Sequence, residues 1–384
     1  MQAIQSLWTF PAIILAAMLI AWAAECGQFY ISQGLALAVL AWVQTLPEFA
    51  VEAVIASSAA KDPSQMHLIT ANFTGSLRLF VGFGWPMIYF TALFFSGEPA
   101  YDKRTGFRRI VMEDENAFTV MGLLPALAYF VTIYLRGVLT PADGLVLAAI
   151  YGAYMFFLSK LPPQEAEGIE DLGRVPRWVM RRPKSQSVAA IAVFFAAGGA
   201  ILYFAAHPFL HSMMALALSL GISQFVFVQW VAPFLSEFPE TLSVFRWARQ
   251  VKKAPMALTN FVSSSMNQWT ILTGMVPFVY SFGLGRLSGI AFDEHQKVEI
   301  LLTLVQSYLG FLFLASMDFS LVEAVGLFGL WLAQFIVPGI REEIIWVYGV
   351  WAAWETFQLL VHFHERNAVR IFFRMSREMI FKKP

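Results

Sequence analysis

The chain has 384 residues, of which 58% are hydrophobic and 14% are charged, and its formal net charge is zero. A mean hydropathy of +0.62 excludes an ordinary soluble domain and is typical of a chain made mostly of membrane spans. The single cysteine, Cys26, excludes an internal disulfide. The sequence therefore predicts an all-α polytopic membrane protein.

Apolar stretches of about 20 residues predict transmembrane helices. The first has no Lys or Arg before it, and Glu25 precedes Cys26 where a lipoprotein signal requires a small residue, so we expect a retained span. Eleven spans are expected, at about 4–24, 34–58, 67–95, 117–136, 140–160, 187–206, 212–246, 255–283, 298–316, 320–338 and 343–363.

The second and third spans carry an acidic signature. The sequence WVQTLPEFAVE, from Trp42 to Glu52, contains Pro47 and Glu48 and is followed by NFTGS from Asn72. Carboxylates at bilayer depth are costly and tend to mark ion or proton pathways. The signature therefore predicts a functional site inside the membrane.

The same signature occurs again in the seventh and eighth spans, as FLSEFPETLSV from Phe234 and NFVSS from Asn260. The offset is 192 residues from Pro47 to Pro239, 188 from Asn72 to Asn260 and 191 from Pro86 to Pro277. A duplicated half is the simplest interpretation. Proline-broken spans at matching places in two halves point to the binding site of a transporter.

Five spans precede the polar segment 161–186, and five follow it before one extra helix. Because five is odd, the second half enters the membrane in the opposite sense, so we expect two inverted-topology five-helix repeats plus an additional C-terminal helix. The expected units are residues 1–160, the cytoplasmic linker 161–186, residues 187–338, and residues 339–384 with the extra helix and a basic cytoplasmic tail. The linker is either a plain connector or a regulatory segment.

Lys and Arg are unevenly distributed between the two sides of the expected membrane. The side that holds the linker and the tail carries 20 of the 26, the other side carries 5, and Arg78 lies inside the third span. The positive-inside tendency predicts an N-terminus outside and a cytoplasmic C-terminus, in a bacterial inner (plasma) membrane. The tail alternates Arg with Phe, which predicts an amphipathic helix on the inner leaflet.

The residue types of the two signatures suit a hard cation. Proline cannot donate a backbone hydrogen bond, so Pro47 and Pro239 leave the carbonyls of Val43 and Leu235 without their usual helical partner. A nearby glutamate adds negative charge, which gives an all-oxygen site of the kind that Ca²⁺ prefers. In each copy Asn and Ser are four residues apart and share one helix face. The alternative is a proline kink whose glutamate pairs with a neighbouring helix.

The two signatures resemble those of the cation/Ca²⁺ antiporter superfamily, in particular the sodium/calcium exchanger membrane regions, with their G-T-S-x-P-E and G-N-x-x-G-S-N motifs. The resemblance covers residues 4–338 and implies two inverted five-helix halves. It implies cation coordination by Glu48 and Glu240, assisted by the matching amides and hydroxyls. These are Asn72, Asn260, Ser76 and Ser264.

The sequence departs from the family motifs at positions that bear on the coupling ion. Leu77 and Ser265 replace the asparagine after Gly-Ser, which argues against sodium coordination, while Glu52 and Glu237 add a second acid to each signature helix. Thr45 and Ser236 complete the candidate ligand set. The extra acids favour proton coupling, but sodium remains an alternative.

The resemblance implies an antiporter that exports Ca²⁺, or a related divalent cation, in exchange for Na⁺ or H⁺ by alternating access. The expected partners are cations and the lipid bilayer, with no nucleic acid and no cofactor, and the oligomeric state stays open. No HExxH, P-loop, G-x-S-x-G or GxGxxG motif occurs, so we do not expect an enzyme.

Arg78 leaves a second hypothesis open. It lies two residues after Ser76, and we expect it to neutralise Glu52 or Glu237, with gating or snorkelling as alternatives. A protein that kept this fold but lost transport would hold the Arg78 guanidinium in the ion site as a tethered cation.

Overall fold

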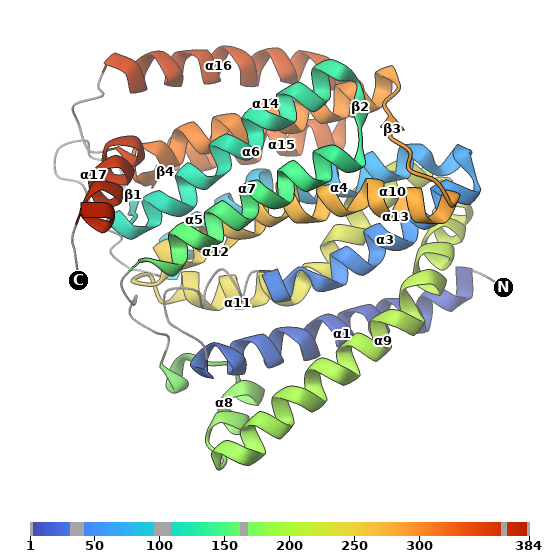
Figure 1. The fold of residues 1–384 in the computed structure, drawn as a ribbon, viewed down its shortest axis with the longest axis horizontal. Coiled ribbons are helices and arrows are strands. Elements are labelled where there is room, and N and C mark those ends of the chain that lie inside the picture. The colour runs from blue at the N-terminus through green and yellow to red at the C-terminus, as the bar shows by residue number, and fades with distance from the viewer. Residues whose placement is uncertain (1–2, 31–41, 96–108, 162–167, 362–366, 382–384) are drawn as a thin grey trace.

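A computed structural model describes residues 3–30, 42–95, 109–161, 168–361 and 367–381. Within these ranges the chain is almost entirely helical, which confirms the all-α class (Figure 1). Seven helices in the described part of the chain are long and apolar enough to cross a membrane. They occupy Ala3–Tyr30, Pro63–Phe95, Asp114–Arg136, Pro141–Ser159, Lys184–Ser219, Glu294–Ala315 and Pro338–Val361.

The first half contains six described helices and two short strands. The helices are α1 (Ser6–Gly27), α3 (Leu46–Lys61), α4 (Met66–Leu79), α5 (Trp85–Phe95), α6 (Ala117–Arg136) and α7 (Pro141–Ser159). The strands are β1 (Arg109–Val111) and β2 (Val138–Leu139). A five-residue π-helical segment, η4 (Phe80–Gly84), joins α4 to α5. The start of the second expected span, residues 34–41, lies outside the described residues.

The second half repeats this pattern after the short linker helix α8 (Arg174–Met180). Its helices are α9 (Lys184–Ser219), α10 (Gln224–Ser236), α11 (Phe238–Arg249), α12 (Ala254–Asn267), α13 (Thr273–Leu284), α14 (Glu294–Ala315) and α15 (Leu321–Ile336). The strands are β3 (Ile290–Ala291) and β4 (Asp318–Ser320), and a π-helical segment, η7 (Gln268–Leu272), joins α12 to α13. Two more helices, α16 (Arg341–Val361) and α17 (Ala368–Phe381), follow the repeats.

One predicted boundary is wrong. We expected the sixth span to end near residue 206 and the seventh to begin near 212, but α9 continues to Ser219 with Pro208 inside it. Membrane helices tolerate an internal proline, because neighbouring groups can satisfy the freed carbonyl. The chain turns instead at Gly221, whose φ of +68° is readily adopted only by a residue without a Cβ atom.

The two strand ladders show that the halves are related by an inverted two-fold repeat. β1 pairs antiparallel with β4, so that Ile110 faces Phe319, and β3 pairs with β2, so that Ile290 faces Leu139. Ile290 lies 180 residues after Ile110, and Phe319 lies 180 residues after Leu139, so the two pairs occupy equivalent positions of the repeat. Each ladder therefore joins a strand of one half to a strand of the other. The ladders lie at opposite ends of the bundle, as inversion requires (Figure 1).

The helix caps follow the same repeat. Thr140 and Asp143 form a capping box at the start of α7, and Ser320 and Glu323 form one at the start of α15. In each box the hydroxyl accepts from one backbone N–H and the carboxylate accepts from another, which satisfies two donors at the helix start. The offset is again 180 residues, so local sequence and global topology agree.

The signature helices lie in the middle of the bundle. α3, α4, α10, α12 and α13 form the centre, α1 and α9 run side by side along one edge, and α16 lies along the opposite edge (Figure 1). Many side chains of the central helices are buried, whereas Leu7, Tyr203 and Trp346 on the outer helices α1, α9 and α16 are 78%, 81% and 75% exposed. An exposed apolar belt of this kind suits contact with lipid.

The tail forms the amphipathic helix that its sequence predicts. Ala368 and Ile371 of α17 are buried, whereas Arg370 and Arg374 are exposed. The ring of Phe372 packs 4.9 Å from that of Phe118 on α6. The described part of the linker also packs on the bundle, through an ion pair of 2.6 Å between Lys253 Nζ and Asp171. That ammonium group, as donor and as charge, lowers the pKa of the Asp171 carboxyl below its usual value.

Candidate functional site

Both signature prolines begin a helix in the centre of the bundle. Pro47 is the second residue of α3 and Pro239 is the second residue of α11, positions where the missing N–H costs no helical hydrogen bond. Glu48 and Glu240 follow in the first turn. The free N–H groups and the positive dipole end of a helix favour negative charge there. The local sequence thus places two carboxylates at two inward-facing helix starts.

In the second half the signature residues contact one another. Asn260 Nδ2 donates to Glu240 Oε1 at 2.8 Å, and Ser264 Oγ donates to the same oxygen at 2.5 Å. Glu240 is 1% exposed, and its Oε2 has no partner among the described residues. The predicted grouping of acid, amide and hydroxyl is therefore present in this half.

In the first half the amide contacts a different acid, Glu52, and the hydroxyl is shared between Glu237 and Glu48. Asn72 Nδ2 donates to Glu52 Oε2 at 2.6 Å, and Ser76 Oγ donates to Glu237 Oε1 of the opposite half. The two extra acids of the signatures are therefore held by the Asn and Ser of the third span, and the two halves of the site are not equivalent.

Glu48 is reached from the second half. Gln268 Nε2, at the start of η7, donates to Glu48 Oε2 at 2.6 Å and lies 3.0 Å from Glu237 Oε1. Its neighbour Asn267 donates through Nδ2 to Thr45 Oγ1. Sequence reasoning missed both amides, although they are a polar pair that begins three residues after the end of NFVSS. Together they join the signature of the first half to the third helix of the second.

Ser236, the remaining candidate, bonds within its own helix. Its Oγ donates to the carbonyl oxygens of Ala232 and Pro233, at 3.0 and 3.2 Å. The structure therefore places Ser236 beside Glu237 in the chain, with its hydroxyl proton engaged by α10 rather than by a carboxylate.

The site is a buried group of oxygens that lacks donors. Glu48, Glu52, Glu237 and Glu240 are at most 3% exposed, and the charge of Glu237 interacts with those of Glu48 and Glu240. Seven buried oxygens of the signature acids and asparagines and of the two neighbouring amides have no hydrogen-bond partner among the described residues. They are Glu48 Oε1, Glu52 Oε1, Glu240 Oε2, Asn72 Oδ1, Asn260 Oδ1, Asn267 Oδ1 and Gln268 Oε1. Buried acceptors without donors are costly, and a hard cation satisfies such oxygens.

The carboxylates do not form a compact cluster. No group of three or more His, Cys, Asp or Glu side chains close enough to hold a metal occurs in the described ranges. The amide nitrogen of Gln268 bridges Glu48 and Glu237, and that of Asn260 donates to Glu240, whereas the amide oxygens of both residues have no partner among the described residues. A cation held here would therefore take a mixture of charged and neutral oxygen ligands.

Arg78 has other partners than the sequence suggested. Its Nη2 forms an ion pair of 2.5 Å with Glu299 Oε2, its Nη1 donates to Gln334 at 3.0 Å, and its Nε donates to Thr74 O at 3.2 Å. The expected pairing with Glu52 or Glu237 is therefore wrong. The guanidinium is held by Glu299 of α14 and Gln334 of α15, which sequence spacing does not bring near α4.

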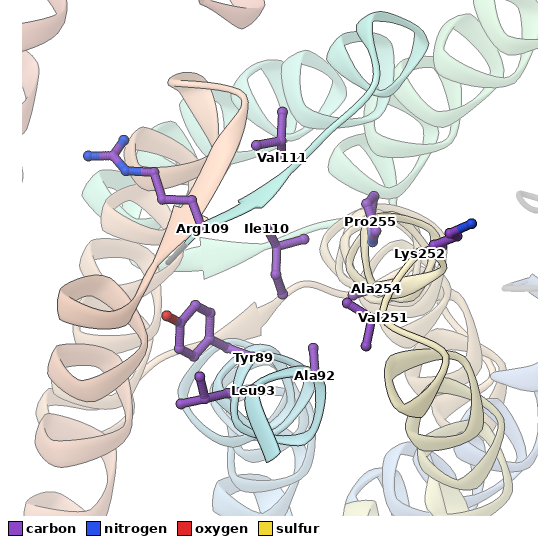
Figure 2. A pocket seen from close by; sticks show the side chains of 10 residues that line it. All are labelled: Tyr89, Ala92, Leu93, Arg109, Ile110, Val111, Val251, Lys252, Ala254 and Pro255. Carbon is purple, nitrogen blue, oxygen red and sulfur yellow. The ribbon is translucent and has the colours of Figure 1, made fainter. Parts of the chain in front are cut away.

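A separate pocket of about 230 Å³ lies away from these carboxylates. Figure 2 shows Ile110 of β1 between α5 and the turn that joins α11 to α12, whereas the guanidinium of Arg109 points outward. The lining is mostly apolar and contains no signature residue. This pocket is not the candidate site.

The family model of the sodium/calcium exchanger protein matches residues 5–160 and 190–337. The chain belongs to this family. The two matched segments are the two halves, and each contains one Pro-Glu signature. The family consists of transporters rather than catalysts, and it explains the inverted fold. No curated protein sequence matches the chain.

Solved structures share this exchanger fold over most of their length. The H⁺/Ca²⁺ exchanger CAX is 28% identical, with a TM-score of 0.88, and the match covers 100% of this chain and 92% of that one. YfkE is 15% identical, with a TM-score of 0.60 and coverage of 87% and 95%. The sodium-calcium exchanger NCX_Mj is also 15% identical, with a TM-score of 0.54 and coverage of 87% and 99%. At 15% identity the likeness shows the fold alone.

Proposed function

We propose that this member of the family exports Ca²⁺ in exchange for protons, by alternating access around Glu48 and Glu240. The observation that carries the proposal is the set of donor-free buried oxygens around four buried carboxylates, contributed by both halves. Both Pro-Glu acids are proposed cation ligands, with the side-chain oxygens of Asn72 and Asn260 as neutral ligands.

The arrangement gives a physical reason for exchange. Carboxylates that share a dry site repel one another unless a cation or protons lie between them. A loaded site, whether it holds Ca²⁺ or protons, is therefore far less costly to carry through the transport cycle than an empty ionised one. Ca²⁺ and protons compete for the same oxygens, and this competition couples their movements.

Three observations favour the proton over sodium as the coupling ion. The H⁺/Ca²⁺ exchanger CAX resembles the chain at 28% identity over its whole length, whereas the sodium-calcium exchanger is 15% identical. The chain also has four acids at the site, and each can carry a proton. Leu77 and Ser265 remove the asparagines of the sodium-type motif.

The proposal includes an orientation. The 20 Lys and Arg residues on the side of the linker and tail favour a cytoplasmic face there, with the N-terminus outside. The start of α4 and the start of α14 then lie on the outer side. The proposed membrane is the plasma membrane of a bacterium.

Uptake of radioactive Ca²⁺ by proteoliposomes tests the function. One set of vesicles is loaded with acid buffer, and a second set is loaded with Na⁺ at the same neutral pH as the outside medium. Both sets are then diluted into Ca²⁺ at neutral pH, with and without Mn²⁺ or Mg²⁺ as competitors. We expect uptake from the acid-loaded vesicles only, abolished by an ionophore that collapses the pH gradient. Uptake driven by Na⁺ alone would overturn proton coupling, and no uptake under either gradient would overturn exchange itself.

A further inference from the structure

We propose that Glu299, Arg78 and Arg341 form a one-sided lock, which holds the outer passage to the carboxylate site closed and recruits the last helix, α16, into the transport cycle. The inference rests on the proposed exchange function. Glu299 and Arg341 are positioning residues in this proposal, because they act on α4 and α10 rather than on the cation.

Glu299 joins four helices at one buried point. Its Oε2 accepts from Arg78 Nη2 of α4 at 2.5 Å and from Gln229 Nε2 of α10 at 2.7 Å. Its Oε1 accepts from Arg341 Nη1 of α16, and Arg341 Nη2 donates to Gln229 Oε1 at 3.0 Å. The side chains of Glu299 and Arg78 are 0% exposed. Burying these charges costs desolvation energy, which the ion pairs and hydrogen bonds offset because every carboxylate oxygen of Glu299 has a donor.

Arg78 connects this network to the ion site. Its Nε donates to the carbonyl oxygen of Thr74, at 3.2 Å, and its guanidinium lies 5.3 Å from the ring of Trp230. Thr74 lies in the turn that carries Ser76, whose hydroxyl donates to Glu237. The position of Glu299 therefore fixes a helix turn that contributes directly to the carboxylate site.

The same helices separate a pocket from the carboxylate site. A pocket of about 890 Å³ with a mixed polar and apolar lining lies at the start of α4 and α10, is lined by His67 and Phe225, and reaches Glu299 and Arg341. Deeper along this helix pair, a Cβ atom on Gly75 would lie 1.9 Å from Gln229 O, so the two backbones touch there. The Ser76–Glu237 hydrogen bond lies beyond this contact. Because Arg78 of α4 and Gln229 of α10 both bond to Glu299, the network holds these two helices together between the pocket and the site.

The lock has no counterpart in the other half. The offset of 188 residues that relates α4 to α12 places Met266 at the position of Arg78, and the offset of 180 that relates α6 to α14 places Thr119 at that of Glu299. Arg341 lies outside both repeats. If the two halves close the two faces of the site in the same way, an ion-pair network on one face only stabilises the conformation in which that face is closed. The energy of this network therefore biases which face is open.

The test measures the Ca²⁺ concentration that half-saturates transport at each face, in right-side-out and inside-out vesicles. Arg341→Gln removes one arm of the lock but leaves Glu299 paired with Arg78, so this variant keeps a compensated charge and is expected to fold. We expect the half-saturating Ca²⁺ concentration to fall at the face that carries the pocket and to rise at the opposite face, each by roughly threefold to tenfold.

Two further variants keep the test decisive. Arg341→Lys restores a positive charge at Glu299 but cannot donate to Gln229 as well, so its shifts should be smaller than those of Arg341→Gln. Arg136→Gln breaks an ion pair with Asp143 that joins α6 and α7, away from α4 and α10, and should shift neither value. Equal changes at both faces, or a lower maximal rate alone, would overturn the lock. Absence of exchange in the unaltered protein would instead overturn the proposed function.

Discussion

The amide nitrogen of Gln268 lies 2.6 Å from a carboxylate oxygen of Glu48, although the two residues are 220 positions apart in the chain. A donor from the second half thus holds the principal acid of the first half. The hydrogen bond stabilises the carboxylate when no cation is bound, because a charged acceptor in a dry site gains much from a donor.

Replacing Gln268 should therefore change how strongly Ca²⁺ stabilises the protein. In Gln268→Met the carboxylates of Glu48 and Glu237 lose their shared donor, so the melting temperature without Ca²⁺ should fall by a few degrees. The rise in melting temperature on adding Ca²⁺ should become larger, because the cation then compensates carboxylates that have lost their hydrogen-bond donor. Thermal unfolding in detergent, with and without Ca²⁺, gives both values.

Phe80 provides the matched control for this prediction. It holds the corresponding π-helical position of the first half and packs against the ring of Phe261 at 4.7 Å. Phe80→Leu should lower the melting temperature through a core cavity but leave the Ca²⁺-dependent increase unchanged. An unchanged increase in Gln268→Met would show that the amide does not act on the carboxylates.

Glu52→Gln should separate proton coupling from cation binding. The substituted amide still offers an oxygen to Asn72, so the local contact at 2.6 Å can persist while one proton-accepting group is lost. Uptake at saturating Ca²⁺ should stay within about threefold of normal, whereas its dependence on pH should become shallower. A pH series of initial rates measures the slope. Glu294→Gln, an exposed change near the start of α14, should leave it unaltered.

Gly75→Ala should disrupt the contact between α4 and α10. The added methyl group would lie 1.9 Å from Gln229 O, so the helices must separate, at a cost of about 1–3 kcal/mol and with loss of transport. Gly199→Ala is the control, because no atom lies within 4 Å of its added Cβ. That change should preserve transport and slightly raise the melting temperature. Normal uptake by Gly75→Ala would contradict the close packing.

Asp171→Asn should reveal a pH-dependent contribution of the linker. Lys253 lowers the pKa of Asp171 in the folded protein, so the ion pair stabilises the fold above the ordinary aspartate pKa of about 3.9. This contribution disappears as the pH falls through the lowered value. The variant should be less stable by at most about 1 kcal/mol at neutral pH. In thermal unfolding, the difference from the unaltered protein should shrink only below the ordinary aspartate pKa.

The repeat and its principal acids could be predicted from the sequence, because they depend on local chemistry. Pro47 and Pro239 must start or break a helix wherever they lie, and the spacing from Asn to Ser fixes a shared face. The offset between the copies then gives the repeat, and the odd number of spans in each half gives its inversion. The ladder pairs Ile110–Phe319 and Ile290–Leu139 confirm this arrangement.

The hydrogen-bond partners inside the site could not be predicted, because they join distant segments. Arg78 and Glu299 are 221 residues apart, and Glu299 alone looks like an ordinary acid near the start of a span. Asn72 is four residues before Ser76, yet the two side chains reach different acids, Glu52 and Glu237. Such choices depend on how α4, α10 and α14 pack, which single-helix spacing does not specify.

Ca²⁺ uptake by acid-loaded proteoliposomes that contain Glu48→Gln or Glu240→Gln is the most direct test of the central claim. The amide keeps the size of each side chain but removes the charge that would hold the cation. We predict that either change reduces uptake to the level of protein-free vesicles, while both proteins still fold and reconstitute. Uptake by the Glu48→Gln protein at the rate of the unaltered exchanger would contradict the assignment of the site.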